Sequence, residues 1–284
     1  MILRLAMAVI LVAAMGGAGT AQAADSTPDR SALAAGAGEA PERSVAAHQA
    51  LEAAQWEETE EGFEVMRART GAGASLVALR IPPERFVFAI AVQTGDKGER
   101  VDAFGEREGA LIAINGGFFG EDEESKRLFP VGLLRVGGKD FSPAWNLMGG
   151  VAVIKDGRLS LRPSSAGVPE ATGNVLQSKP MLIEPGGKWA MNTNQGHLRP
   201  RSLLCTLKSG ETLILVVKGA GLSLYEAGWL MREASAGGYF GCDAALALDG
   251  GGSTQLWIAG HEDLSFAGET PVHNALIVKR RGAE

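Results

Sequence analysis

The chain has 284 residues, a net charge of −6 and 45% hydrophobic residues. This length and apolar content suit one globular domain with a substantial core and short appended segments. The acidic balance excludes broad nucleic-acid binding, which requires a basic face, but it allows a local site for a small anionic ligand.

The N-terminus has the pattern of a secretory signal peptide. Arg4 provides a positive charge, the run from there to Met15 is apolar, and Ala21-Gln22-Ala23 matches a small-x-small cleavage site. The apolar run is shorter than the ~20 residues that a transmembrane helix requires. We therefore predict a signal peptide over 1–23 with cleavage near Ala23/Ala24, a periplasmic or secreted bacterial protein, and no stable membrane insertion after signal removal.

The rest of the chain is predicted to contain a flexible or helical lead over 24–61 and one domain over 62–284. A weak apolar stripe favours a helix over 44–60. Short apolar runs separated by turn residues predict strands at 63–69, 75–81, 86–92, 110–114, 133–136, 150–154, 159–161, 202–207, 212–217, 244–248 and 272–278.

Local signals specify several connections. Asp156-Gly157 is typical of a two-residue hairpin turn, and 208–211 is a second hairpin connection. Gly71 and Gly73 lack the third glycine and following helix of a dinucleotide-binding loop, so a hairpin is expected there too. A capping-box spacing begins a predicted helix over 223–235. Many strands and few helices predict an α+β fold, a single domain with a mixed β-sheet core and a few packing helices.

The cysteines leave two interpretations open. Two cysteines and four scattered histidines have no metal-ligand spacing, which excludes a zinc site. Export would permit Cys205 and Cys242 to form a disulfide. Two buried, unpaired thiols fit the sequence equally well.

Two predicted strands end in the same way. The strand over 110–114 runs into Asn115-Gly116-Gly117, and the strand over 244–248 runs into Asp249 followed by three glycines. Strand ends at a sheet edge often bind ligands, and glycines there let backbone N–H groups face an anion or a sugar hydroxyl. Taken singly, each segment fits a tight turn in which Asn or Asp caps its own backbone. Their recurrence favours a shared cleft.

Three basic residues lie between these two segments in the sequence. Arg201 precedes a strand, where its guanidinium could bind a phosphate or carboxylate, although a surface charge fits equally well. Lys179 and Arg199 are expected to be solvated surface charges.

Six blocks follow one another in a characteristic order: AINGGFF at 113–119, PVGLLRVGGKDFSP at 130–143, QSKPMLI at 177–183, RPRSLLCTL at 199–207, GCDAALALDGGGSTQL at 241–256 and PVHNALIV at 271–278. With these blocks, residues 62–279 resemble the phosphodiester glycosidase family, which includes a lysosomal enzyme that removes N-acetylglucosamine to uncover mannose 6-phosphate. The sequence departs from the family pattern at Lys179, where the pattern has Gly, and at SLLCTL, which replaces a TAIG-like segment.

The resemblance implies a set of site residues: Asn115, Ser178, Arg201, Asp249, Gly250, Gly251, Ser253, Thr254 and Asn274. Gly116, Gly117 and Gly252 belong to the same blocks and are included as substrate-binding positions. Asp249 is expected to activate water or stabilise an oxocarbenium-like sugar. Arg201 and the Gly250–Thr254 loop are expected to hold the phosphate, while Asn115 and Asn274 bind sugar hydroxyls.

The implied activity is an exported hydrolase that cleaves the C–O bond of a sugar-1-phosphodiester, such as an N-acetylglucosamine-1-phosphodiester, in cell-envelope or exopolysaccharide glycan metabolism. Ordinary glycosidases use two carboxylates. A phosphate leaves readily because its second ionisation lies near ~6, so one carboxylate, Asp249, with Arg201 and Asn115 can suffice. No cofactor is required, although Asp249 could hold a divalent cation.

The expected partner is a small-molecule or glycan phosphodiester, with no nucleic acid, and the sequence does not specify an oligomeric state. Two alternatives stay open. One is a non-catalytic envelope module that binds phosphorylated glycans, and the other is a phosphodiesterase that cuts the P–O bond.

Overall fold

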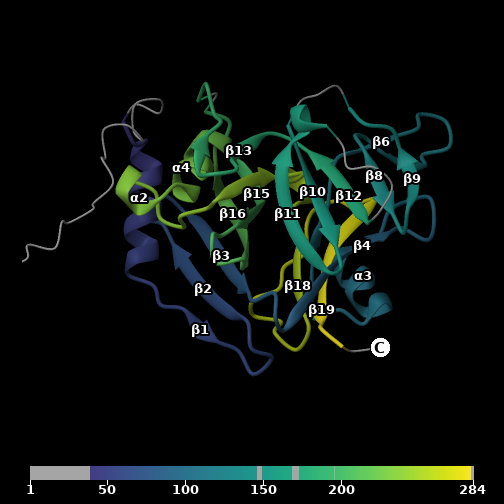
Figure 1. Cartoon of the computed structure of the whole chain (residues 1–284), viewed down its shortest axis with the longest axis horizontal. Coiled ribbons are helices and arrows are strands. Elements are labelled where there is room, and N and C mark those ends of the chain that lie inside the picture. The colour runs from purple at the N-terminus through teal and green to yellow at the C-terminus, as the bar shows by residue number, and fades with distance from the viewer. Residues whose placement is uncertain (1–38, 146–148, 168–172, 195, 283–284) are drawn as a thin grey trace, which may run out of the picture.

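The structure is a computed structural model that describes residues 39–145, 149–167, 173–194 and 196–282 (Figure 1). The predicted signal peptide, and the predicted lead before residue 39, lie outside the described residues. Within the described ranges, no helix is both long enough and apolar enough to cross a membrane.

An eight-stranded antiparallel sheet forms one layer of the molecule. Its strands, in spatial order, are β1 (Glu57–Glu58), β2 (Glu64–Arg69), β3 (Ala74–Ile81), β16 (Thr212–Leu222), β15 (Arg199–Thr206), β17 (Ala244–Ala247), β13 (Met181–Glu184) and β14 (Lys188–Trp189).

Three smaller sheets form the opposite side. The five-stranded sheet has the order β11 (Arg158–Pro163), β10 (Gly150–Lys155), β12 (Asn174–Ser178), β8 (Leu134–Val136) and β9 (Lys139–Ser142). The four-stranded sheet has the order β18 (Leu256–Ile258), β5 (Ile112–Asn115), β19 (Asn274–Arg280) and β4 (Phe86–Val92). The last is a two-stranded ribbon, β6 (Phe119–Glu121) and β7 (Leu128–Pro130).

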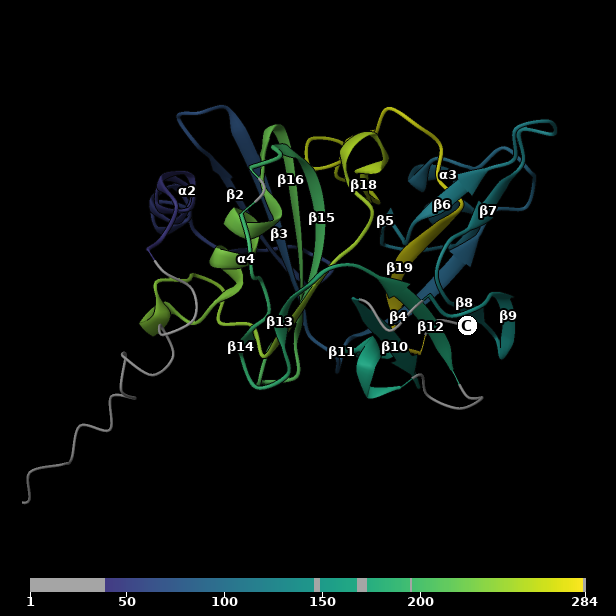
Figure 2. The same ribbon diagram turned by 90° about the horizontal axis from the view of Figure 1, so that it is seen from above.

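Helices cover the outer faces of these sheets. Figure 2 shows α2 (Glu42–Glu52) and α4 (Leu224–Met231) on the side of the eight-stranded sheet that faces away from the smaller sheets. The third helix, α3 (Val101–Glu108), packs on the four-stranded sheet. The predicted α+β class of a single domain is confirmed, and the ladders between the described strands are antiparallel.

Side chains of the central strands point alternately to the two faces of the sheet, and each face is covered by its own hydrophobic core. On β15, Leu204 points into the core between the sheets, whereas Leu203 and Cys205 point into the core beneath α2 and α4. Successive side chains of a strand face opposite sides, so a strand buried on both faces reads as a continuous apolar run. This is why 202–207 and 212–217 were recognisable as strands.

The predicted turns form as expected. Asp156 and Gly157 have φ values of 51° and 74° between β10 and β11, the positive values that a two-residue hairpin turn of this type requires. The Ser223 side chain accepts from the Glu226 N–H at 3.1 Å and the Glu226 carboxylate accepts from the Ser223 N–H at 2.7 Å, which completes the capping box of α4.

The helix expected over 44–60 is shorter than predicted. It ends at Glu52, and β1 follows at Glu57–Glu58. The Ser44 hydroxyl donates to the Glu226 carbonyl oxygen at 3.1 Å, and Leu51 is buried in the core beneath α4. The described part of the lead therefore packs against the domain.

The cysteine question is resolved by a disulfide. Cys205 on β15 and Cys242, just before β17, are bonded, with their Cα atoms 5.6 Å apart. Both residues are buried on the face covered by the helices. The bond therefore adds a covalent link between neighbouring segments of the eight-stranded sheet.

Candidate active site

The two similar strand ends lie side by side and bond to each other. The Asn115 Nδ2 donates to the carbonyl oxygen of Asp249 at 2.7 Å, and the Asp249 N–H donates to the carbonyl oxygen of Gly116 at 3.2 Å. Since β5 and β17 belong to different sheets, these bonds connect the two layers at one edge.

The pairing of β15 with β17 sets the position of Arg201 relative to Asp249. Leu203 lies opposite Ala247 in this antiparallel ladder. Two residues further along each segment, the same register puts Arg201 opposite Asp249. Because side chains alternate with a period of two, this pair shares the face of Leu203 and Ala247, which is the face covered by α4.

Asp249 and Arg201 line a cavity of about 230 Å³ at this strand end, next to a larger cavity of about 660 Å³. Five residues line both cavities: Phe118, Lys179, Arg199, Arg201 and Leu224. Among the described residues that line either cavity, Asp249 is the only carboxylate. The site therefore combines one acid with three cations.

The structure adds to the expectation for Lys179 and Arg199. Arg199 is exposed as expected and Lys179 is half-buried, and both line the two cavities. The Lys179 Nζ lies 3.9 Å from the centroid of the Trp145 ring, a cation–π contact that holds the ammonium without neutralising it. Their place in the cavity lining was not predicted, because the cavity is formed by segments that are distant in sequence.

Arg201 is anchored by two backbone carbonyls. Its Nε donates to Leu222 at 2.9 Å and its Nη2 to His197 at 2.7 Å. Burial lowers the pKa of Arg201, and the positive charge of Arg199 lowers it further, while Glu226 acts in the opposite direction. A rigid guanidinium beside a second cation favours an anionic ligand.

Asp249 has a perturbed carboxyl group. Burial raises its pKa above the ordinary value, whereas hydrogen bonds from the Ser253 side chain and the Gly250 N–H lower it. The Gly250 N–H donates to Oδ1 at 2.8 Å. A carboxylate with opposing environmental effects, placed on a cavity wall, is a candidate acid or base.

The loop after Asp249 binds much of its own backbone. Besides Gly250, the N–H of Ser253 donates to the Gly250 carbonyl at 3.3 Å and that of Thr254 to the Gly251 carbonyl at 3.1 Å. These three N–H groups, which were expected to hold a phosphate, are therefore occupied in this conformation. The self-capping turn that the sequence also allowed is present. Gly251 of this loop lines the smaller cavity.

The three glycines of the loop, Gly250, Gly251 and Gly252, have different structural surroundings. A Cβ on Gly250 would lie 3.0 Å from the Pro200 carbonyl oxygen, and one on Gly252 would lie 3.1 Å from Glu269 Oε2. Gly251 has open space around it but a φ of +61°, which favours glycine. Close backbone packing explains Gly250 and turn geometry explains Gly251 without reference to a ligand, whereas the neighbour of Gly252 is a flexible side chain.

Asn115 and Asn274 were expected to contact sugar hydroxyls, but both are buried behind the cavities and line neither of them. Asn115 Oδ1 accepts from Ser202 Oγ at 2.6 Å and from the Gln255 N–H at 3.2 Å. Asn274 Oδ1 accepts from the Gly117 N–H at 2.8 Å. In this geometry the two amides position the loops that carry the site.

The three hydroxyl residues of the predicted site are also buried. They are Ser178, Ser253 and Thr254. The Ser178 Oγ and Thr254 Oγ1 have no hydrogen-bond partner among the described residues. None of the three lines either cavity.

Two contributors were not recognised as site residues from the sequence. Phe118 lines both cavities. Gln177 is buried, and its Oε1 accepts from the Leu133 N–H at 3.0 Å and from the Trp145 N–H at 2.6 Å. It thereby positions the ring that holds Lys179. Phe118 lies in the block AINGGFF and Gln177 in the block QSKPMLI, so membership of these blocks was the sequence signal that could have identified them.

His273 is not part of this arrangement of charges. Burial lowers its pKa to about 4, so its imidazole is neutral near pH 7. Its Nδ1 lies 3.4 Å from Asn274 Nδ2, and it lines neither cavity.

The donor set around Asp249 does not fit a divalent cation. Such ions need several oxygen ligands, whereas the cavity presents one carboxylate together with Lys179, Arg199 and Arg201. In the part of the chain that the structure describes, no group of three or more His, Cys, Asp or Glu side chains could hold a metal ion.

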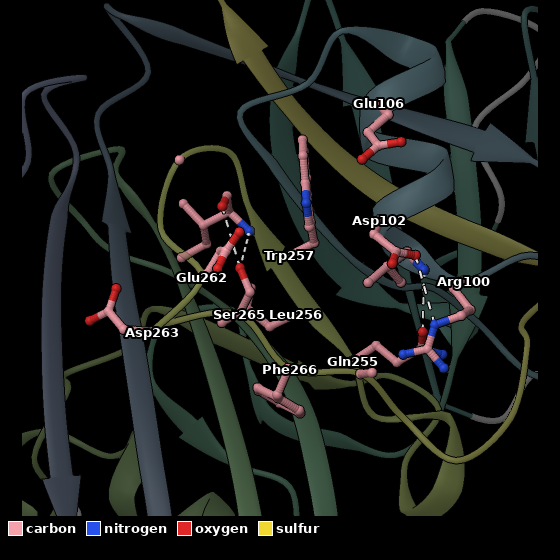
Figure 3. A pocket seen from close by; sticks show the side chains of 14 residues that line it. Arg100, Asp102, Glu106, Gln255, Leu256, Trp257, Glu262, Asp263, Ser265 and Phe266 are labelled. Atoms are coloured by element: carbon pink, nitrogen blue, oxygen red, sulfur yellow. Dashed lines mark hydrogen bonds and ion pairs between the residues drawn. The ribbon is translucent and has the colours of Figure 1, made fainter.

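A cavity of about 680 Å³ lies elsewhere, between α3, β18 and the segment after β18 (Figure 3). Figure 3 shows Asp102 and Glu106 on the helix side and Glu262 and Asp263 on the other side, with Arg100 as the one cation that lines it. Four carboxylates against one guanidinium repel an anion. A phosphate-binding site is therefore expected at Asp249 and not here.

The sequence profile of the phosphodiester glycosidase family matches residues 108–279, which is more than half of the 284 residues. The chain therefore belongs to the phosphodiester glycosidase family. No curated protein matches the sequence significantly.

Solved structures with the same fold have low sequence identity. The catalytic domain of zebrafish N-acetylglucosamine-1-phosphodiester alpha-N-acetylglucosaminidase, autoinhibited by its pro-peptide, is 16% identical with a TM-score of 0.56, covering 80% of this chain and 82% of that one. A hypothetical protein from Synechocystis is 14% identical with a TM-score of 0.54, and the match spans 80% of this chain but only 64% of that one. A predicted exported protein of Burkholderia pseudomallei K96243 is 15% identical with a TM-score of 0.55, covering 73% and 74%.

Proposed function

We propose that the protein hydrolyses the C1–O bond of a sugar-1-phosphodiester of the N-acetylglucosamine-1-phosphodiester type. The observation that carries this proposal is the cavity in which Asp249 faces three cations and no second carboxylate among the described residues. A phosphoester binds through its negative charge, and membership of the phosphodiester glycosidase family supports the same class of reaction.

The positive charges of the cavity suit the increase in negative charge on the phosphate during the reaction. A water oxygen bonds to C1 of the sugar while the C1–O bond breaks, and its electron pair leaves with the phosphate. Asp249 takes one proton from the water, and the other stays on the new sugar hydroxyl. The phosphodiester carries one negative charge and the departing phosphomonoester approaches two. Arg201, Arg199 and Lys179 therefore stabilise charge that grows during the reaction.

The cations also remove an electrostatic difficulty. A carboxylate next to an anion site repels the substrate phosphate. In this cavity three positive side chains share the space with Asp249, so their charges offset the repulsion between the carboxylate and the phosphate. A single carboxylate can thus work beside a phosphate without an intervening metal ion.

The proposed setting is the periplasm or the cell exterior, in cell-envelope or exopolysaccharide glycan metabolism. The signal-peptide pattern over 1–23 supports export. The similarity in fold to a predicted exported protein of Burkholderia pseudomallei is compatible with it.

Hydrolysis in ¹⁸O-labelled water tests the bond that breaks. The protein is incubated with the N-acetylglucosamine-1-phosphodiester of glycerol, and both products are analysed by mass spectrometry. We expect ¹⁸O in the free sugar and none in glycerol phosphate. Label in a phosphate, with sugar-1-phosphate as product, would instead show a phosphodiesterase. Binding without turnover would show a non-catalytic glycan-binding module.

Two matched variants test the role of Asp249. D249N is expected to lose at least about 100-fold in kcat, because an amide cannot take the proton. D243N changes the same functional group at the opposite end of β17, where Asp243 Oδ1 accepts from the Gly186 N–H at 3.2 Å. It should keep nearly full activity. A folded D249N with unchanged turnover would remove Asp249 from the mechanism.

A further inference from the structure

The larger cavity has a distinctive distribution of charge. Its lining includes the three cations Lys179, Arg199 and Arg201 and no carboxylate among the described residues. The remaining lining is aromatic, apolar or uncharged polar, and includes Phe118, Tyr225 and Thr193. Asp249 lies only in the smaller cavity. The reacting C1 atom therefore belongs at the smaller end, and the group beyond the phosphate extends into the larger cavity.

Two of the cations are not neutralised. Neither Lys179 nor Arg199 makes an ion pair with a described residue, since the ion pairs of the described chain involve other side chains. Glu226 offsets part of the charge of Arg201, but its carboxylate is buried in the capping box and lines neither cavity. One phosphodiester charge is shared among three cations in this arrangement.

Lys179 is held in place before any ligand binds. Its ammonium lies on the Trp145 ring, and that ring packs against Phe118 with the centroids 5.8 Å apart. The backbone N–H of Trp145 donates to Gln177 Oε1 at 2.6 Å, which fixes the segment that carries the ring. An aromatic support positions a cation but adds no negative charge, so the ammonium keeps its capacity to bind an anion.

Building on the proposed function, we infer that the substrate carries a second anionic group beyond the scissile phosphate, and that Lys179 with Arg199 binds this group in the larger cavity. The substrate class is a sugar-1-phosphodiester whose leaving alcohol bears a phosphate or carboxylate. Lys179 is then a specificity-determining residue.

A pair of compounds that differ by one charged group tests the inference. One is the N-acetylglucosamine-1-phosphodiester of glycerol, and the other is the corresponding diester of glycerol 3-phosphate. Affinities are measured by calorimetry with D249N, in which turnover is expected to be at least about 100-fold slower, and kcat/KM is measured with the wild type. We expect the second compound to bind about tenfold more tightly or better, as one charge-assisted contact provides, with the preference falling at high salt.

Three substitutions locate the preference. K179M keeps an unbranched side chain on Trp145 but removes the charge, and should reduce the preference about fivefold or more. K179R should retain it. K155Q removes a charge from an exposed position at the end of β10, outside both cavities, and should leave both affinities unchanged.

The outcomes separate the inference from the proposed function. Equal binding of the two compounds, or a preference that K179M leaves intact, overturns the inference even if both are hydrolysed. A preference for the second compound that depends on Lys179 supports the inference even if neither compound is hydrolysed, in which case only the proposed catalysis fails. Binding of neither compound overturns both.

Discussion

At the residue scale, the proposed chemistry depends on the balance of effects on the pKa of Asp249. Burial raises the pKa of its carboxyl group, and hydrogen bonds from Ser253 and Gly250 lower it. Burial penalises the charged form, whereas a donor to the carboxylate stabilises it. The N–H of Gly250 belongs to the backbone, but the Ser253 hydroxyl can be removed by substitution. Ser253 thus allows the pKa of Asp249 to be changed without altering Asp249 itself.

We expect S253A to shift the acid limb of the pH–activity profile to higher pH. A base must be ionised, so activity falls as the pH falls through the pKa of Asp249. Loss of the Ser253 hydrogen bond raises that pKa further, which moves the limb upward. On the plateau, kcat should stay within about threefold of the wild type, because the carboxylate is still present.

The profile of kcat/KM against pH provides the measurement, and S209A provides the control. Ser209 is exposed and its hydroxyl donates to Glu211 Oε2 at 2.8 Å, away from both cavities. S209A should reproduce the wild-type limb. An S253A profile that coincides with the wild-type profile would show that the acid limb does not reflect the ionisation of Asp249.

At the element scale, the junction between β5 and β17 brings the site together. The turn after β5 packs closely against the start of β19, since a Cβ on Gly116 would lie 2.0 Å from Asn274 Oδ1. The turn after β17 is less crowded at Gly251, where the φ of +61° is the main restriction. Both glycines follow a polar residue at a strand end, but they are required for different reasons.

We therefore expect G116A to destabilise the protein more than G251A. Alanine at 116 must displace a buried amide and should cost about 2–3 kcal/mol of unfolding free energy. Alanine at 251 keeps its space and should cost about 1 kcal/mol for the left-handed backbone. Urea unfolding with equal m-values gives the comparison. A larger loss for G251A would mean that the junction is not tightly packed at Gly116.

These elements also show what the sequence could predict. Strands buried on both faces and turns with strong local chemistry, such as 212–217 and Asp156-Gly157, were predictable because neighbouring residues determine them. Helix α3 was missed. It contains Gly105, whose Cβ would lie 2.2 Å from an atom of the Trp257 ring, and this packing reason is invisible in a local pattern.

The candidate site was predictable to a similar extent. Asp249 and Arg201 could be selected because they stand in ordered sequence blocks, and the β15–β17 register places them opposite each other. The roles of Asn115 and Lys179 could not be predicted. The way in which separate sheets meet determines whether an amide faces a cavity or lies behind it. It also determines whether a lysine lines a cavity or faces solvent.

At the scale of the whole molecule, the eight-stranded sheet separates two cores, and the disulfide lies in the one covered by α2 and α4. The Cys205–Cys242 bond closes a sequence separation of 37 residues. That segment includes β16, α4 and the turn into β17. A cross-link of this length restricts the unfolded chain by about 3–4 kcal/mol in the chain-entropy treatment. The native positions of Arg201 and Asp249 follow instead from the β15–β17 ladder.

Removing the disulfide should therefore lower stability but preserve activity. We expect the double variant C205A/C242A to lose about 3 kcal/mol of unfolding free energy. Alanine is chosen because both positions are fully buried among apolar side chains. Urea unfolding of this variant should match that of the reduced wild type, whereas kcat/KM at 25 °C should stay within about twofold, since the ladder that aligns Arg201 with Asp249 is intact. A large loss of activity in a variant that is still folded would show that the disulfide, and not the ladder, positions the site.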